Sequence, residues 1–296
     1  MKLNKDQKLF RDKFIEFAEE LYKQGDKELL NILRQQKIDR DKVLNEVGMI
    51  LLRYNIQDTS LKLSHTEYKK EYKNLDILIS NVFESQYNGE KVATDKLLKM
   101  IAEDKYYSNS FLLLLGLDFK LNKIKTKDIK KILDATIEGK NYSDRIWSNK
   151  NKVAKVIKKE MKDFLQGNTN VNDIYKLVKE RFNQNAYITR RLVQNEVGRV
   201  QNEANELWAK DNGIEYQLFD ATLDNKTTEL CQSLDGTVYK ADDPNKRIPN
   251  INTHVNCRSC LISLPNKDYK PRSRIDNTSK KDIDWTTYKE WKSKNV

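Results

Sequence analysis

Proline is absent from residues 1–213, and all four prolines of the 296-residue chain lie beyond them. Proline disrupts a helix interior because it lacks an N–H donor and its ring clashes with the preceding turn. So long a stretch without proline predicts an extended helical region. Apolar residues recur there at helical spacing, first in Phe10, Phe14, Phe17 and Leu21 and again in Val43, Val47, Ile50, Leu51 and Tyr54.

Capping and stop residues predict where several of these helices begin and end. Thr126 and Ser143 are expected to cap two of them, with Gly139 and Gly167 as their stops. An amphipathic stretch follows Asn172, and a longer polar helix comes after it. The expected helices are 126–139, 143–167, 174–182 and 187–210.

Beyond residue 213 the pattern changes to short strands and turns. Strands are expected at 215–219, in 234–239 after a turn at Asp235–Gly236, and at 261–264. We therefore predict a mainly α fold with a helical N-terminal region and a small C-terminal α+β module at 214–266.

The chain is expected to divide into three parts. These are a helical N-terminal region at 1–125, a domain at 126–266 whose helices lead into the module, and a basic C-terminal tail at 267–296. In the tail, Trp285, Tyr288 and Trp291 fall at helical spacing, which favours either a docking helix or a tail that orders on a partner.

All three cysteines and one of the two histidines fall between residues 231 and 260, in the pattern C-x22-H-x2-C-x2-C. Thiolates and an imidazole at this spacing suit tetrahedral Zn²⁺. We predict a closed structural zinc site, because four protein ligands leave no open position for catalysis. The predicted ligands are Cys231, His254, Cys257 and Cys260.

Two other interpretations of this cluster stay open. In one, Cys231 packs as a small hydrophobic residue while His254 and Cys257 fix the loop through hydrogen bonds. In the other, Cys257 and Cys260 form a disulfide or redox pair.

Positive charge is concentrated in two stretches of a chain whose net charge is +11. Residues 120–165 hold 14 basic and six acidic residues, and residues 267–296 hold nine and five. Such a field attracts polyanions. We predict that lysines near Tyr142 and Trp147 contact double-stranded DNA without reading its sequence, although a solvated outer helix face would look the same. These are Lys152, Lys155, Lys158, Lys159 and Lys162.

Hydropathy predicts no membrane span, because no stretch of 18 apolar residues occurs. The charged N-terminus lacks the apolar region of a secretory signal. We therefore expect synthesis in the reducing cytosol, where cysteines are more often metal ligands or free thiols than disulfides.

Further residues around the Cys/His cluster recur in a fixed order: a T-x-D element, L-D-G after a cysteine, a proline-bearing loop and then H-x-N-C-R. This order resembles the phage head morphogenesis (minor capsid) family that includes the F protein of phage Mu. The matching positions are Thr222, Asp224, Cys231, Leu234, Asp235, Gly236, His254, Asn256, Cys257 and Arg258.

The resemblance covers roughly residues 140–265, and the chain departs from it at three places. Thr228 stands where the family often has a second cysteine, Val255 replaces the usual proline, and Ser259 interrupts the usual C-R-C.

The resemblance implies a minor head protein of a tailed phage or prophage, present in a few copies and bound to the portal or the major capsid protein. It would act in head assembly or DNA delivery, first in the host cytoplasm and then inside the virion head.

Catalysis is not expected. Asp220, Asp224, Asp235 and His254 could be imagined as a Mg²⁺ nuclease site, but aspartates are ordinary in turns. Arg258 is expected to pair with a carboxylate rather than to catalyse. The alternatives to a head protein are a virion-carried metal-dependent nuclease and a zinc-stapled DNA-binding regulator.

Overall fold

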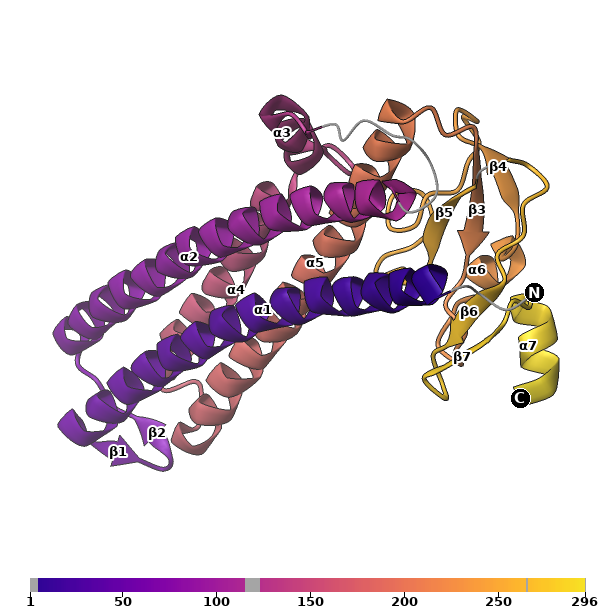
Figure 1. The fold of residues 1–296 in the computed structure, drawn as a ribbon. Coiled ribbons are helices and arrows are strands. Elements are labelled where there is room, and N and C mark those ends of the chain that lie inside the picture. The colour runs from indigo at the N-terminus through magenta and orange to yellow at the C-terminus, as the bar shows by residue number, and fades with distance from the viewer. Residues whose placement is uncertain (1–4, 115–122, 265, 296) are drawn as a thin grey trace. The chain divides into compact units, whose positions relative to one another are not determined.

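A computed structural model describes residues 5–114, 123–264 and 266–295, with the side chains of 5–25 and 110–114 left out. The helices are α1 (Lys5–Arg53), α2 (His65–Leu114), α3 (Thr126–Asp134), α4 (Tyr142–Leu165), α5 (Val171–Asp211), α6 (Glu229–Leu234) and α7 (Tyr288–Asn295). The strands are β1 (Ile56–Gln57), β2 (Ser60–Leu61), β3 (Tyr216–Asp220), β4 (Val238–Lys240), β5 (Cys260–Leu264), β6 (Ser273–Asp276) and β7 (Lys281–Asp284). The predicted mainly α fold with a small C-terminal α+β module is confirmed (Figure 1).

The chain forms two compact units. The bundle unit consists of Lys23–Leu97 and Thr136–Val193, and the C-terminal unit consists of Met1–Tyr22, Leu98–Ala135 and Gln194–Val296. The domain boundaries expected from the sequence remain predictions. No helix in the described ranges is long and apolar enough to cross a membrane.

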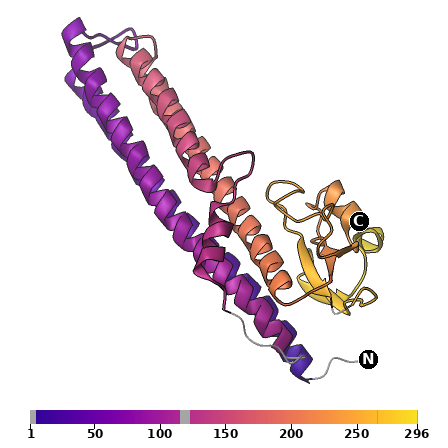
Figure 2. The same cartoon turned by 90° about the horizontal axis from the view of Figure 1, so that it is seen from above.

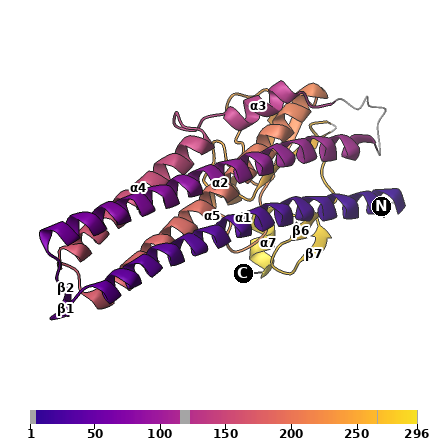
Figure 3. The ribbon, with the colours of Figure 1, turned by 90° about the vertical axis from the view of Figure 1, so that its left-hand side faces the viewer.

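The bundle unit packs parts of α1, α2, α4 and α5 lengthwise beside one another (Figures 2 and 3). Its core is apolar and takes residues from all four helices, including Val47, Phe83, Ile157 and Phe182. The small β1–β2 hairpin joins α1 to α2. The apolar face predicted for Phe10, Phe14, Phe17 and Leu21 is formed by residues whose side chains the structure does not describe.

Three predicted helix boundaries were wrong. Thr126 is the first residue inside α3 rather than its cap, and α3 ends at Asp134, well before Gly139. Asn141, not Ser143, caps α4, because it exchanges hydrogen bonds of 3.0 and 3.1 Å with Asp144 in a capping box.

The two helices predicted at 174–182 and 187–210 form the single helix α5. Asn185, between the two predicted ranges, and Thr189, near the start of the second, are buried among the bundle helices, 1% and 2% exposed. In the sequence, polar residues such as these resemble a linker between two helices. In the structure they continue the buried face of α5.

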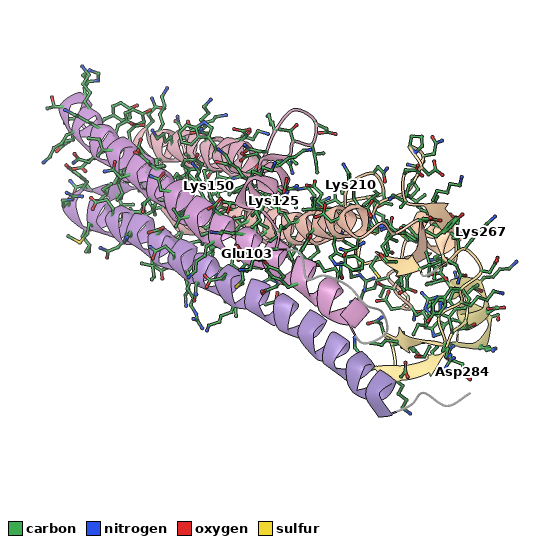
Figure 4. The ribbon with its side chains drawn as sticks, turned by 45° about the horizontal axis from the view of Figure 1, so that its top comes forward. Glu103, Lys125, Lys150, Lys210, Lys267 and Asp284 are labelled. Carbon is green, nitrogen blue, oxygen red and sulfur yellow. The ribbon has the colours of Figure 1, made fainter. Side chains whose placement is uncertain are left out.

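These residues belong to a buried polar layer around an ion pair. Lys150 Nζ lies 2.6 Å from Glu90 Oε2, and both side chains are 2% exposed. Lys150 also donates to Asn185 Oδ1 at 3.0 Å and Thr189 Oγ1 at 3.1 Å. Figure 4 shows Lys150 on α4, within the bundle. Burial lowers the pKa of Lys150, and Glu90 opposes that shift.

The C-terminal unit contains a three-stranded antiparallel sheet in the order β4-β3-β5. The strands expected at 215–219, 234–239 and 261–264 correspond to β3, β4 and β5. The tail differs from the expectation, because 273–284 form the β6–β7 hairpin. Tyr288 and Trp291 lie on α7 and pack against Leu223 of the same chain.

Removing the charge of Lys150 should destabilise the chain strongly. Lys150→Met leaves Glu90 buried and unpaired, which costs about 3–5 kcal/mol of unfolding free energy. Urea denaturation followed by circular dichroism measures this cost. The control is Lys152→Met, at an exposed position of the same helix, for which we expect less than about 0.5 kcal/mol. Equal effects of the two changes would contradict the buried ion pair.

Candidate metal centre

The cluster is assembled by one short helix and one loop of the C-terminal unit. Cys231 lies on α6, whose N-cap Thr228 accepts a hydrogen bond from the Cys231 N–H at 3.5 Å. His254 and Cys257 come from the loop between β4 and β5. Cys231 and Cys257 are buried against Phe219 and Leu261, so the sulfur atoms lie at the edge of a small apolar core.

Three of the four predicted ligands meet. Cys231 Sγ lies 3.1 Å from His254 Nε2 and 3.4 Å from Cys257 Sγ. The three ligand atoms lie within 4.8 Å of one another, which makes a group that can hold a metal ion. Two sulfurs and an imidazole nitrogen are the donors that Zn²⁺ prefers.

The surroundings of the three donors fit a metal site. His254 Nδ1 lies 3.1 Å from the carbonyl oxygen of Val255, the contact that commonly orients a metal-binding imidazole. Hydrogen bonds from Cys231, from the Ser259 N–H and from nearby hydroxyls lower the pKa of Cys257 to about 5, against the opposing effect of burial. A thiolate at Cys257 is the form that binds a metal.

Cys260 is not brought to this group. It lies on β5 opposite Asp220, and its Sγ is 3.9 Å from Asp220 Oδ2. Its strand neighbour Leu261 points into the apolar core, so alternation along the strand turns Cys260 to the other face. The C-x2-C spacing alone could not show this, because it contains no information on where the strand begins. All three cysteines are free thiols.

The ligand loop is fixed to α5. Asn250 donates from Nδ2 to the Cys257 carbonyl oxygen at 2.6 Å, and the Asn256 N–H donates to Asn195 Oδ1 at 3.0 Å. Asn250 and Asn256 have φ values of 60° and 58°, a left-handed conformation that asparagine tolerates. Gly198 lets the loop approach, because a Cβ there would lie 2.5 Å from Asn250 Nδ2.

The T-x-D and H-x-N-C-R elements meet in an ion pair. Both terminal guanidinium nitrogens of Arg258 donate to the Asp224 carboxylate, one of them at 2.8 Å between Nη2 and Oδ1. Thr222 Oγ1 donates to the Arg258 carbonyl oxygen at 2.8 Å. The expected pairing of Arg258 with a carboxylate is therefore confirmed, and Asp224 is the partner.

The L-D-G element forms the turn after α6. Asp235 is the C-cap of α6, and Gly236 follows with φ of 79° and donates its N–H to the Phe219 carbonyl oxygen at 2.9 Å. A positive φ is far less costly for glycine than for other residues. Leu234 packs against the apolar core beside the cysteines.

Asp235 accepts hydrogen bonds from several segments. Its carboxylate accepts from the Ala221 N–H at 2.7 Å and the Tyr288 N–H at 2.6 Å. It also accepts two bonds from the Arg274 guanidinium, at 2.9 and 3.0 Å. Asp235 and Arg274 have side chains only 1% and 4% exposed.

Sequence reasoning missed Arg274, which lies outside the motif in the predicted basic C-terminal tail. Its Nη2 also lies 2.5 Å from Asp220 Oδ1. Burial raises the pKa of Asp220 to about 6, against the opposing effect of Arg274. No local pattern marks Arg274, because its partners are far away in the sequence.

The predicted DNA-contacting lysines lie on α4, in the bundle unit. Lys152, Lys155, Lys159 and Lys162 are exposed. Lys158 departs from the prediction: it is partly buried, its Nζ lies 2.8 Å from Asp76 Oδ1, and it donates to Ser80 Oγ. It therefore faces α2 rather than solvent.

A side chain at residue 198 should push the ligand loop away from α5. We expect Gly198→Ala to destabilise the chain by about 1–3 kcal/mol through overpacking and to weaken metal retention. Thermal denaturation with and without a chelator measures both effects. Gly48→Ala in α1 is the control, because its Cβ meets no atom within 4 Å and alanine favours a helix. The idea fails if both substitutions behave alike.

The Asp224–Arg258 pair should make stability depend on pH under acidic conditions. Hydrogen bonds from Arg258, and then from the Lys226 N–H and Thr227, lower the pKa of Asp224 to about 2. A carboxyl whose folded-state pKa is depressed contributes stability above pH 4 that is lost as pH falls towards 2. Asp224→Asn should remove this part of the pH dependence, as measured by unfolding at pH 5, 4, 3 and 2. The exposed Asp242→Asn is the control, and an unchanged slope in Asp224→Asn would contradict the pairing.

Comparison with known families identifies one match. Residues 155–262 match the family model described as Phage Mu protein F like protein. The match covers just over a third of the chain and includes α5, β3, α6, β4 and the three clustered ligands. No curated protein and no solved structure gives a significant match. Residues 155–262 of this chain are therefore similar to the Phage Mu protein F like family, as the motif predicted.

Proposed function

We propose that this chain is a minor head protein of a tailed phage or prophage. The observation that carries the proposal is the family match over residues 155–262, which contains both the motif and the metal-ligand group. The chain would bind the portal or the major capsid protein during head assembly in the host cytoplasm. It would then stay inside the virion head and take part in DNA delivery.

Contact with packaged DNA is the second part of the proposal. Lys152, Lys155, Lys159 and Lys162 follow one another at helical spacing on one face of α4, over about 15 Å. Among the described contacts, none of these four ammonium groups has an ion pair. Four free positive charges in a row fit the phosphate backbone and carry no base-reading chemistry. Binding would therefore be independent of DNA sequence.

Structural zinc is the third part. The three clustered donors would hold Zn²⁺, joining α6 to the ligand loop and so stabilising a module with a small core. When bound, the ion supplies a cross-link between segments that are far apart in the sequence.

A non-enzymatic role fits the carboxylates better than nuclease chemistry. Asp224 is paired with Arg258, while Asp220 and Asp235 both contact Arg274. A Mg²⁺-dependent nuclease needs carboxylates that are free to bind the metal. Arginine pairing of all three supports a structural role for this motif.

The proposed role in the head is tested on particles from a host that carries the gene. Particles are purified by density gradient and their proteins are quantified by mass spectrometry. We expect the chain in DNA-filled heads, at a few copies for each portal. Its absence from purified heads, with the major capsid protein present, would refute the head assignment.

The DNA contact is tested by salt dependence. Binding to duplex DNA of arbitrary sequence should weaken steeply with salt, with a slope of about −0.9 for each phosphate contacted. Changing Lys152, Lys155, Lys159 and Lys162 together to Gln should reduce the magnitude of the slope by about 3–4. Lys158→Gln, at the paired position, should change it little. Sequence-selective binding that survives high salt would contradict the proposal.

A further inference from the structure

The metal-ligand group is one ligand short of a closed zinc site. Structural zinc is held by four protein ligands in a tetrahedron. Within the described residues, the group contains three ligands, Cys231, His254 and Cys257. Cys260, which the sequence offered as the fourth, lies beside Asp220 on the other face of β5.

Residue 228 occupies the place beside Cys231 from which a fourth ligand could come. It precedes Cys231 by three residues, the spacing at which two side chains of a C-x2-C knuckle reach one metal. Its hydroxyl oxygen caps α6 and accepts a hydrogen bond from the Cys231 N–H at 3.5 Å. The residue there is threonine, whose neutral hydroxyl is not among the usual zinc ligands.

Residues on this side of the group are exposed to solvent. Thr228 and its neighbour Glu229 are exposed, and His254 is half-buried, whereas Cys231 and Cys257 are buried. The Thr228 side is therefore the side from which a ligand outside the chain would approach.

We infer that zinc in this chain is held by Cys231, His254 and Cys257 alone, with a fourth position that takes an exchangeable ligand from outside the chain. This inference rests on the zinc part of the proposed function. In the purified protein the exchangeable ligand is water, and an added imidazole or thiol replaces it. The same chemistry would let a histidine or cysteine of a neighbouring protein complete the site.

The experiment replaces zinc with Co²⁺, whose visible and thiolate charge-transfer bands report the ligand set. The full chain is loaded with Co²⁺ and titrated with imidazole. In the wild type, the bands should shift with saturation as imidazole takes the fourth position. Thr228→Cys should add a third thiolate, increase the charge-transfer intensity by about half, since three thiolates then replace two, and abolish the response to imidazole.

Two matched variants complete the design. Thr228→Ser keeps the hydroxyl cap and should behave as the wild type. Cys260→Ser should also leave the bands and the imidazole response unchanged, because Cys260 is outside the group.

The possible outcomes distinguish failure of this inference from failure of the zinc proposal on which it rests. Failure of the wild type to bind Co²⁺ or Zn²⁺ would refute both. A wild type that binds Co²⁺ but ignores imidazole, or that loses a thiolate band in Cys260→Ser, would leave structural zinc standing and overturn the open fourth position.

Discussion

The buried pair of Asp235 and Arg274 is the interaction on which the C-terminal module depends. Asp235 binds the backbone N–H groups of Ala221 and Tyr288, so it joins the end of β3 to the start of α7. Arg274 of β6 connects the β6–β7 hairpin to these segments by donating hydrogen bonds to the carbonyl oxygens of Ala221 and Thr286. Two charged side chains can be buried away from water only when each is fully paired. Removal of one partner typically lowers the free energy of unfolding by about 3–5 kcal/mol. The family motif is therefore completed by a tail that lies outside the matched residues.

The metal-ligand group depends on the same arrangement. Helix α6 is held at one end by its Thr228 cap and at the other by Asp235, with Cys231 between them. The loop that carries His254 and Cys257 is held by the Asn250 side chain and by the hydrogen bond from Asn256 to Asn195 of α5. Gly198 of α5 allows the loop to approach closely. Short secondary structure, a small apolar core and two polar anchors position the donors. A bound ion would then cross-link segments that already lie together.

Sequence patterns predicted the parts of this structure that are encoded locally. Absence of proline and apolar periodicity predicted a helical region but not where each helix begins and ends, and the clustered Cys and His residues marked the site. Long-range partners were not predictable, because the Arg274–Asp220 and Lys158–Asp76 ion pairs join residues that are far apart in the sequence and meet only in the folded chain. The continuity of α5 was hidden for the same reason, since Asn185 is buried by partners on other helices. The assignment of Cys260 was wrong because spacing alone does not fix the face of a strand.

Native mass spectrometry of the purified full-length chain tests most directly the claim that Cys231, His254 and Cys257 form a metal site. Comparing the native and denatured masses of the wild type and of Cys231→Ser counts the bound metal ions and assigns them to this group. The account predicts about one zinc in each native wild-type chain, lost on denaturation and absent from the variant. A metal-free wild type, or a zinc that persists in Cys231→Ser, would contradict it.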